Sequence, residues 1–185
     1  MNNEDIAMKR AVTASLFLTL ILALSSSFAW DPRGNEEDLE KAQTAVDALL
    51  ENNPKMQSYF DAAAGYVVIP TVGKAGLGIG GARGKGFLYE NGEPTAEVTV
   101  TQLSIGFQWG GQAYSEFVFF ENDQSLEQFK KGNYELGAQA SAVAITAGVS
   151  VDAGYESGVA IFTQAKGGLM YEAAVGGQKF KVDEL

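Results

Sequence analysis

The side chains best suited to chemistry in this sequence are three cations in a stretch that contains no acid. Between Asp61 and Glu90 there are 28 residues without Asp or Glu, and Lys74, Arg83 and Lys85 lie among them. Glycines surround these cations, and a glycine-rich backbone can bring its N–H groups close to an anion. The stretch is therefore a candidate site for the phosphate of a lipid headgroup, formed by Lys74, Arg83, Lys85, Gly81, Gly84 and Gly86. The alternative is a set of solvated turns with ordinary exposed cations.

The composition opposes most other chemistries. The chain has no Cys and no His, which excludes thiol nucleophiles, imidazole bases and the usual zinc sites. The run from Gly76 to Gly81 matches the dinucleotide pattern GxGxxG, but that pattern needs a following helix, and here strand and turn residues follow. A net charge of −10 opposes nucleic-acid binding. The sequence predicts a protein that is not an enzyme and has no cofactor or metal.

The first 29 residues have the pattern of an export signal. Lys9 and Arg10 precede an apolar run over residues 11–24, and small residues occupy positions −3 and −1 of a cleavage point after Ala29. The run is shorter than the ~20 residues that span a bilayer, so cleavage is favoured over an uncleaved anchor. We predict a signal peptide over residues 1–29 and a single domain over residues 30–185, exported to the periplasm or the extracellular space. The true start, Met1 or Met8, stays open.

The C-terminal sequence Val-Asp-Glu-Leu resembles an endoplasmic-reticulum retention signal. Valine replaces the lysine or histidine of that signal, so we interpret the resemblance as chance.

Two N-terminal helices and one short internal helix are predicted from the spacing of apolar residues. Asn35 is a candidate N-cap for an amphipathic helix that runs to about Asn52, and Pro54 begins a second helix. The third covers residues 126–131, after a capping run that starts at Asn122. Because the first helix is acidic, we expect it to dock on the domain rather than lie on an anionic membrane.

From Gly65 onward the pattern is that of strands joined by tight turns. It predicts an α+β domain built mainly on an antiparallel sheet, either a sandwich or barrel-like. Pro70 places its strand at an edge or a bulge, and Asn91-Gly92 predicts a hairpin turn.

Three further features of the strand region are predicted. The apolar phase changes after Gln102, from Val98 and Val100 to Leu103, which predicts a β-bulge or bend at that point. Residues 138–147 are predicted as a strand of small side chains, although their alanines also permit a helix. Residues 159–165 and 169–175 are predicted to form a final pair of strands.

Several ordered blocks of the sequence together resemble the SYLF family, a lipid-binding or actin-binding domain. The resemblance covers roughly residues 36–180 and rests on the blocks Gly81-Ala-Arg-Gly-Lys-Gly86, Thr101-Gln-Leu-Ser-Ile-Gly-Phe-Gln108, Gly110-Gly-Gln-Ala-Tyr-Ser-Glu116, Gly137-Ala-Gln-Ala-Ser-Ala142 and Ala165-Lys-Gly-Gly-Leu-Met-Tyr-Glu172. It implies a mainly antiparallel α+β domain that binds phospholipid headgroups, notably phosphoinositides in eukaryotic members. It also implies actin binding in some eukaryotic relatives and lipid contact at the cell envelope in exported bacterial ones.

The leading hypothesis is therefore an exported, non-enzymatic phospholipid-binding domain at the surface of an envelope membrane, with the three cations on the headgroup phosphate. If the cations do not bind it, recognition of a zwitterionic headgroup or an acyl chain would fall to aromatic residues whose default position is the core: Phe87, Trp109, Phe119 and Phe120. The alternative is a structural or protein-interaction module, in which a glycine-rich sheet edge recruits a strand of an envelope protein.

Overall fold

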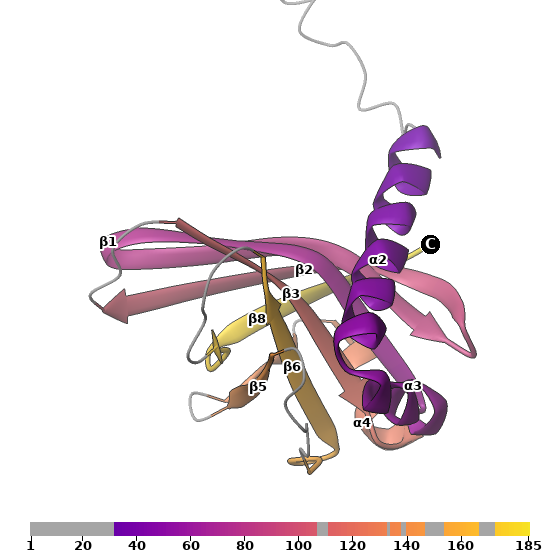
Figure 1. The fold of residues 1–185 in the computed structure, drawn as a ribbon. Helices are drawn as coiled ribbons and strands as arrows, with labels where there is room; N and C mark the ends of the chain where they lie inside the picture. Colours follow the sequence, from indigo (N-terminus) through magenta and orange to yellow (C-terminus); the bar gives the residue numbers. More distant parts are fainter. Residues whose placement is uncertain (1–31, 107–110, 133, 138–139, 147–153, 167–172) are drawn as a thin grey trace, which may run out of the picture. The chain divides into compact units, whose positions relative to one another are not determined.

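The computed structural model describes residues 32–106, 111–132, 134–137, 140–146, 154–166 and 173–185 (Figure 1). The chain divides into residues 1–35 and a second unit, Glu36–Leu185, which holds the sheet. The predicted export signal and Trp109 lie outside the described residues.

The predicted helices are confirmed. They are α2 (Pro32–Asn52), the 3-10 helix η1 (Pro54–Met56) with α3 (Gln57–Ala62), and α4 (Asp123–Lys130). α2 begins before the predicted cap at Asn35, because the fixed φ of Pro32 suits a first helical turn. The predicted cap of α4 does form, since the side chain of Asn122 accepts a hydrogen bond from the backbone N–H of Ser125 at 3.0 Å.

In the described part of the chain the strands form one eight-stranded sheet in the order β4-β8-β2-β1-β3-β6-β5-β7. The paired strands are antiparallel except for β5 and β6, which are parallel. The α+β class predicted from the sequence is therefore confirmed. The strands are β1 (Gly65–Glu90), β2 (Glu93–Gly106), β3 (Gly111–Phe120), β4 (Tyr134–Glu135), β5 (Ser141–Ile145), β6 (Val159–Ala165), β7 (Ala173–Ala174) and β8 (Gln178–Glu184).

β1 doubles back between two arms (Figure 1). Its first arm, residues 65–75, pairs with β3, and its second arm, residues 78–90, pairs with β2. The arms lie against each other: a Cβ at Gly86 would stand 2.7 Å from the Cα of Ile69, and a Cβ at Gly84 would stand 2.7 Å from the Cγ2 of the same isoleucine. Real Cβ atoms do not come that close, so the glycines permit the approach of the two arms.

The bulge in β1 and the turn after it form where the sequence predicts them. Its register with β3 shifts between Ile69 and Val72, which places Pro70 at a bulge as predicted. The predicted hairpin turn to β2 also forms, since Asn91 and Gly92 have φ values of 54° and 83°.

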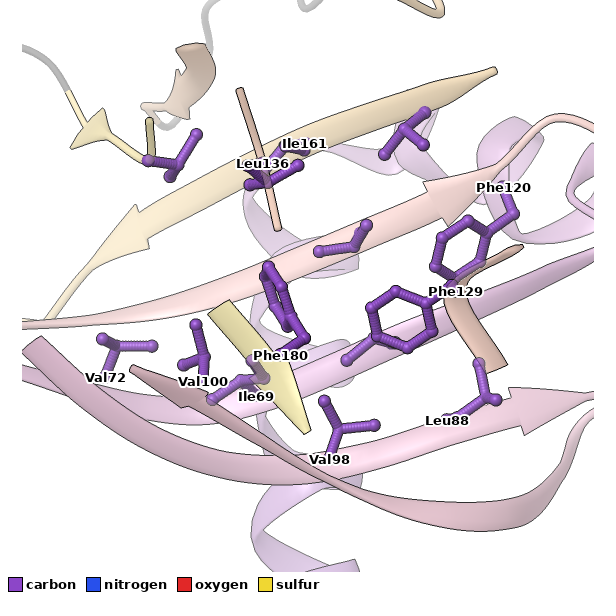
Figure 2. Packing of buried hydrophobic residues seen from close by; sticks show 14 of the residues in the cluster. Ile69, Val72, Leu88, Val98, Val100, Phe120, Phe129, Leu136, Ile161 and Phe180 are labelled. Carbon is purple, nitrogen blue, oxygen red and sulfur yellow. The ribbon is translucent and has the colours of Figure 1, made fainter. Parts of the chain in front are cut away.

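The two faces of the sheet carry separate apolar clusters, because neighbouring residues of a strand point to opposite faces. The inner face holds Ile69, Val98 and Phe180 with α4 residues such as Phe129, and Figure 2 shows this packing. The outer face is covered by the N-terminal helices through a second cluster, whose fully buried members are Ala42, Leu49, Met56, Val68, Phe117, Phe119 and Phe162.

The sheet is strongly curled. Gln178 of β8 donates a hydrogen bond from Nε2 to Oε2 of Glu116 on β3 at 3.0 Å. These strands are not neighbours, because β2 and β1 lie between them in the sheet. The bond therefore crosses the inner face from one side of the sheet to the other.

The predicted bulge after Gln102 is wrong. The pairing of β2 with β1 runs without a shift from Val98 to Leu103. Gln102 takes an inward, buried position, where its Nε2 donates to the carbonyl oxygen of Gly176 at 3.0 Å. Because the amide Nε2 of Gln102 finds an acceptor inside, the strand keeps its phase and Leu103 points outward, with 86% of its surface exposed.

The predicted strand over residues 159–165 is confirmed as β6. Its predicted pairing with the following strand is wrong within the described residues. β6 pairs with β3 and β5, and β7 pairs with β5; residues 169–172 lie outside the described part of the chain. β5 confirms the preference for a strand in the segment 138–147. The last strand, β8, was not predicted, because only Phe180 and Val182 interrupt its polar sequence.

Candidate functional site

Two of the predicted cations lie side by side on the outer face of the sheet. Arg83 and Lys85 are both exposed and alternate with the buried Ala82 and Gly84 along β1. Across the β1–β2 ladder Arg83 faces Thr101 and Lys85 faces Thr99. Cross-strand partners of an antiparallel pair share one face, with their Cβ atoms about 4.5–5.5 Å apart.

β8 extends both rows with two further cations. Lys179 faces Thr101 and Lys181 faces Thr99 across the β2–β8 ladder, and both lysine side chains are 68% exposed. Two rows of side chains thus cross three strands, each with a threonine between two cations. We call this surface the cationic face: Arg83, Lys85, Thr99, Thr101, Lys179 and Lys181.

The lysines of β8 were missed at the sequence level. The alternation Lys179-Phe180-Lys181-Val182 was visible in the sequence and is typical of a strand with one buried face. The pairing register that brings them beside Arg83 and Lys85 is a tertiary property, which a pattern along the chain does not contain.

The charges of the cationic face differ in how they are paired. Lys179 forms an ion pair with Glu135 at 3.3 Å and Lys181 with Asp183 at 2.6 Å. Arg83 and Lys85 have no ion pair with any residue in the part of the chain that the structure describes. Exposed ion pairs contribute only about 0–1 kcal/mol, so both lysines can exchange their carboxylates for another anion.

Acids border the cationic face on one side. The next row along the three strands is Phe87, Glu97 and Asp183. Phe87 is buried and belongs to the cluster under the helices. The charge of the surface therefore changes from positive to negative within one row of side chains. An anion can approach the cationic rows but is repelled at this border.

An apolar side chain borders the opposite side. Leu103 follows Thr101 on the same face of β2, opposite Gly81 of β1. At 86% exposure it contrasts with the other large apolar side chains of the described residues, among which Leu185 at the C-terminus is the next most exposed at 60%. The cationic face thus ends in an apolar group free to enter an apolar phase.

The remaining predicted cation, Lys74, is not part of this surface. It faces Gln112 of β3 on the first arm of β1, two positions from Val72, which lies in the inner cluster. Alternation places Lys74 on the inner side of the sheet, whereas Arg83 and Lys85 lie on the outer side.

The predicted glycines have structural positions. Gly84 and Gly86 are buried where the two arms of β1 meet, and Gly81 faces Leu103 at the apolar end of the cationic face. All three lie in extended strand with no positive φ, so they do not form the alternating conformation of an anion-binding nest. Whether any of them contacts a ligand stays a prediction.

The aromatic residues named as an alternative lie in the core where they are described. Phe87 is 3% exposed, and Phe119 and Phe120 are 0% exposed. Their packing is explained by ring contacts, such as Phe120 with Phe129 at a centroid distance of 4.8 Å. They offer no surface to an acyl chain in this conformation.

Other features of the structure give weaker support for a functional site. A groove of about 650 Å³ beside α2 is lined by small and polar residues, including Ala45, Ala48, Ser115, Gln164 and Lys166. Within the described residues no three His, Cys, Asp or Glu side chains gather as metal ligands. The described helices also include none with the length and apolar character needed to cross a bilayer.

A comparison with known protein families finds a match in the C-terminal part of the chain. Residues 101–184 match the family model Ysc84, described as "Las17-binding protein actin regulator". Beta cell expansion factor A of Aeromonas veronii is 27% identical over 146 residues, which cover 77% of this chain and 55% of that protein. The chain thus spans about half the length of the curated relative it matches.

The matched segment contains the whole of β8 and the outward residues Thr101 and Leu103. Arg83 and Lys85, on β1, lie before it. Over residues 101–184 the chain thus matches the Ysc84, or SYLF, family model, in agreement with the resemblance that its sequence blocks predicted.

Proposed function

We propose that this protein is an exported lipid-binding domain that docks its cationic face on the anionic surface of an envelope membrane. The observation that carries the proposal is the row structure of that face, in which Arg83, Lys85, Lys179 and Lys181 converge from two strands around two threonines. The chain has a net charge of −10, so four cations gathered on one surface favour a role in binding an anion.

The chemistry of the face suits phosphorylated headgroups. Arg83 can bind a phosphate through two parallel N–H donors, and the lysines act as point charges beside it. The threonine hydroxyls between them can donate to phosphate oxygens. Each cation held near an anionic bilayer contributes about 1 kcal/mol.

Leu103 gives the docking an apolar component. Insertion of its side chain below the headgroups would remove most of its exposed apolar surface from water. The acidic row at Glu97 and Asp183 would lie at the opposite border, away from the bilayer, so the domain would tilt with β2 and Leu103 leading.

The test is flotation of the protein with vesicles of phosphatidylcholine, with and without phosphatidylglycerol. Replacing Arg83, Lys85, Lys179 and Lys181 by Gln should lower binding to the anionic vesicles at least about tenfold. The matched control replaces the exposed Lys41, Lys55, Lys131 and Lys166 by Gln, which changes the net charge equally and should leave most of the binding. Equal losses in both variants would mean that only net charge matters, and the proposal would fail.

A protein partner is the second candidate. The family description names a binding partner, Las17, for its actin regulators, and the paired charges Lys179–Glu135 and Lys181–Asp183 are a surface that another protein can also match. Tight capture of one envelope protein by the wild type, lost in the cationic-face variant and accompanied by no vesicle binding, would favour this candidate.

Export is part of the proposal and has its own test. It is supported by the basic pair, apolar run and small residues that end at Ala29. Intact-mass measurement of protein recovered from the periplasm or medium should give a chain that begins at Trp30. Recovery of the uncleaved chain from the cytoplasm would contradict it.

A further inference from the structure

Glu116 is a buried carboxylate on the inner face of the sheet, which is the face opposite to the cationic face. It is 0% exposed and follows Tyr114 on the inward side of β3. Thr163 of β6 is its cross-strand partner, and Gln178 of β8 reaches it from the far side of the curled sheet, with Nε2 3.0 Å from Oε2 of Glu116. The same Nε2 lies 3.4 Å from the hydroxyl oxygen of Tyr114.

This cluster has polar oxygens without a hydrogen-bond partner. Oε1 of Glu116, Oγ1 of Thr163 and Oε1 of Gln178 are all buried and have no hydrogen-bond partner within the described part of the chain. Each unsatisfied buried polar group costs about 1–3 kcal/mol. All three are oxygens, and they come from three strands whose side chains converge on Glu116. The Thr163 hydroxyl can supply one donor, so the cluster still lacks donors or a positive charge for its remaining lone pairs.

Glu116, when ionised, has no compensating positive charge in the described part of the chain. Glu116 forms no ion pair with a described Lys or Arg, and the titratable side chain beside it is Tyr114. Burial raises the pKa of Glu116 to about 7. A proton on the carboxyl would supply one donor and leave the other oxygens without one, and a water molecule would supply donors but leave the charge.

We propose that Glu116, Thr163 and Gln178 bind a small monovalent cation: sodium, potassium or ammonium. Oxygen donors of this kind suit hard cations rather than transition metals. One carboxylate balances one positive charge, whereas a divalent ion would leave a net charge in the core. The bound cation would tie β3, β6 and β8 together, on the side of the sheet opposite to the proposed lipid surface.

The experiment is thermal unfolding of the full-length chain without lipid, in choline chloride that is replaced stepwise by sodium, potassium or ammonium chloride at constant ionic strength. Choline, a bulky quaternary ammonium ion without N–H groups, serves as the reference. At least one of the three small cations should raise Tm saturably, by about 4 °C at ten times its Kd. The ion with the lowest midpoint identifies the ligand.

Variants separate the site from general salt effects. Glu116→Gln should abolish the rise, whereas Glu97→Gln on the outer face should keep it. If Glu116→Gln does not fold, Thr163→Val removes one ligand and keeps the carboxylate, and it should move the midpoint several-fold higher. Equal Tm values of the wild type in all four salts, or a rise that persists in Glu116→Gln or is unmoved in Thr163→Val, would overturn the proposal. Because lipid is absent, none of these outcomes depends on the cationic face.

Discussion

Single residues decide how closely the two arms of β1 approach. At Gly86 an added Cβ would stand 2.7 Å from the Cα of Ile69 and closer still to the carbonyl oxygen of Val68, so backbone, not a mobile side chain, blocks it. At Gly73, on the first arm, an added Cβ meets nothing within 4 Å. A side chain at Gly86 would therefore collide with backbone, whereas a side chain at Gly73 would have open space.

This contrast gives a matched pair of substitutions. Gly86→Ala should lower the free energy of unfolding by about 1–3 kcal/mol or more, because the arms must separate. Gly73→Ala should change it by less than about 0.5 kcal/mol, as an exposed strand position without special contacts. Urea unfolding followed by circular dichroism measures both. A small effect of Gly86→Ala would show that the arms have room to part.

At the scale of elements, the sequence predicts best what short-range rules determine. The cap at Asn122, the turn at Asn91-Gly92 and the bulge at Pro70 each follow from local chemistry, and each forms. The outward position of Leu103 depends instead on a buried glutamine, Gln102, whose partner is 74 positions away in the sequence. Apolar periodicity does not record such a bond, so the bulge was predicted in its place.

The same limit applies to the candidate site. Arg83 and Lys85 could be found from the sequence because they are near neighbours in an acid-free stretch. Lys179 and Lys181 join them only through the register of β8 on β2. Lys74, which is closer in sequence, lies on the other face because side chains alternate along β1 and Lys74 is an odd number of residues from Arg83.

The cap of α4 supplies a prediction at the scale of the element. Asn122→Ala removes the acceptor for the Ser125 N–H and should cost about 1 kcal/mol of unfolding free energy. Asn122→Asp keeps an acceptor and adds a negative charge at the helix N-terminus, so its free energy of unfolding should stay close to that of the wild type. Because α4 packs Leu126 and Phe129 into the inner cluster, chemical denaturation of the whole domain reports on it. Equal losses in the two variants would assign the effect to something other than capping.

At the scale of the whole molecule, a protein of net charge −10 is repelled by an anionic membrane unless its cationic face is turned toward the membrane. The repulsion acts over a Debye length, which falls from ~10 Å at 0.1 M salt to ~3 Å at 1 M. The attraction of the cationic face is screened in the same way, but burial of Leu103 is not. Electrostatic and apolar contributions can therefore be separated by salt.

We expect vesicle binding by the wild type to fall at least about tenfold between 0.1 and 1 M salt, because about 1 kcal/mol per membrane-near cation is progressively screened. Leu103→Ala should lower binding at both salt concentrations by a similar factor, about three- to tenfold, since the apolar surface that it removes is insensitive to salt. The quadruple Gln variant of the cationic face should instead lose its difference from the wild type at 1 M. Flotation across a salt series with all three proteins measures these curves. If the effect of Leu103→Ala disappears at high salt, the leucine acts only by placing the charges and does not enter the membrane. If binding of the wild type is independent of salt, the cations are not what holds the domain to the bilayer.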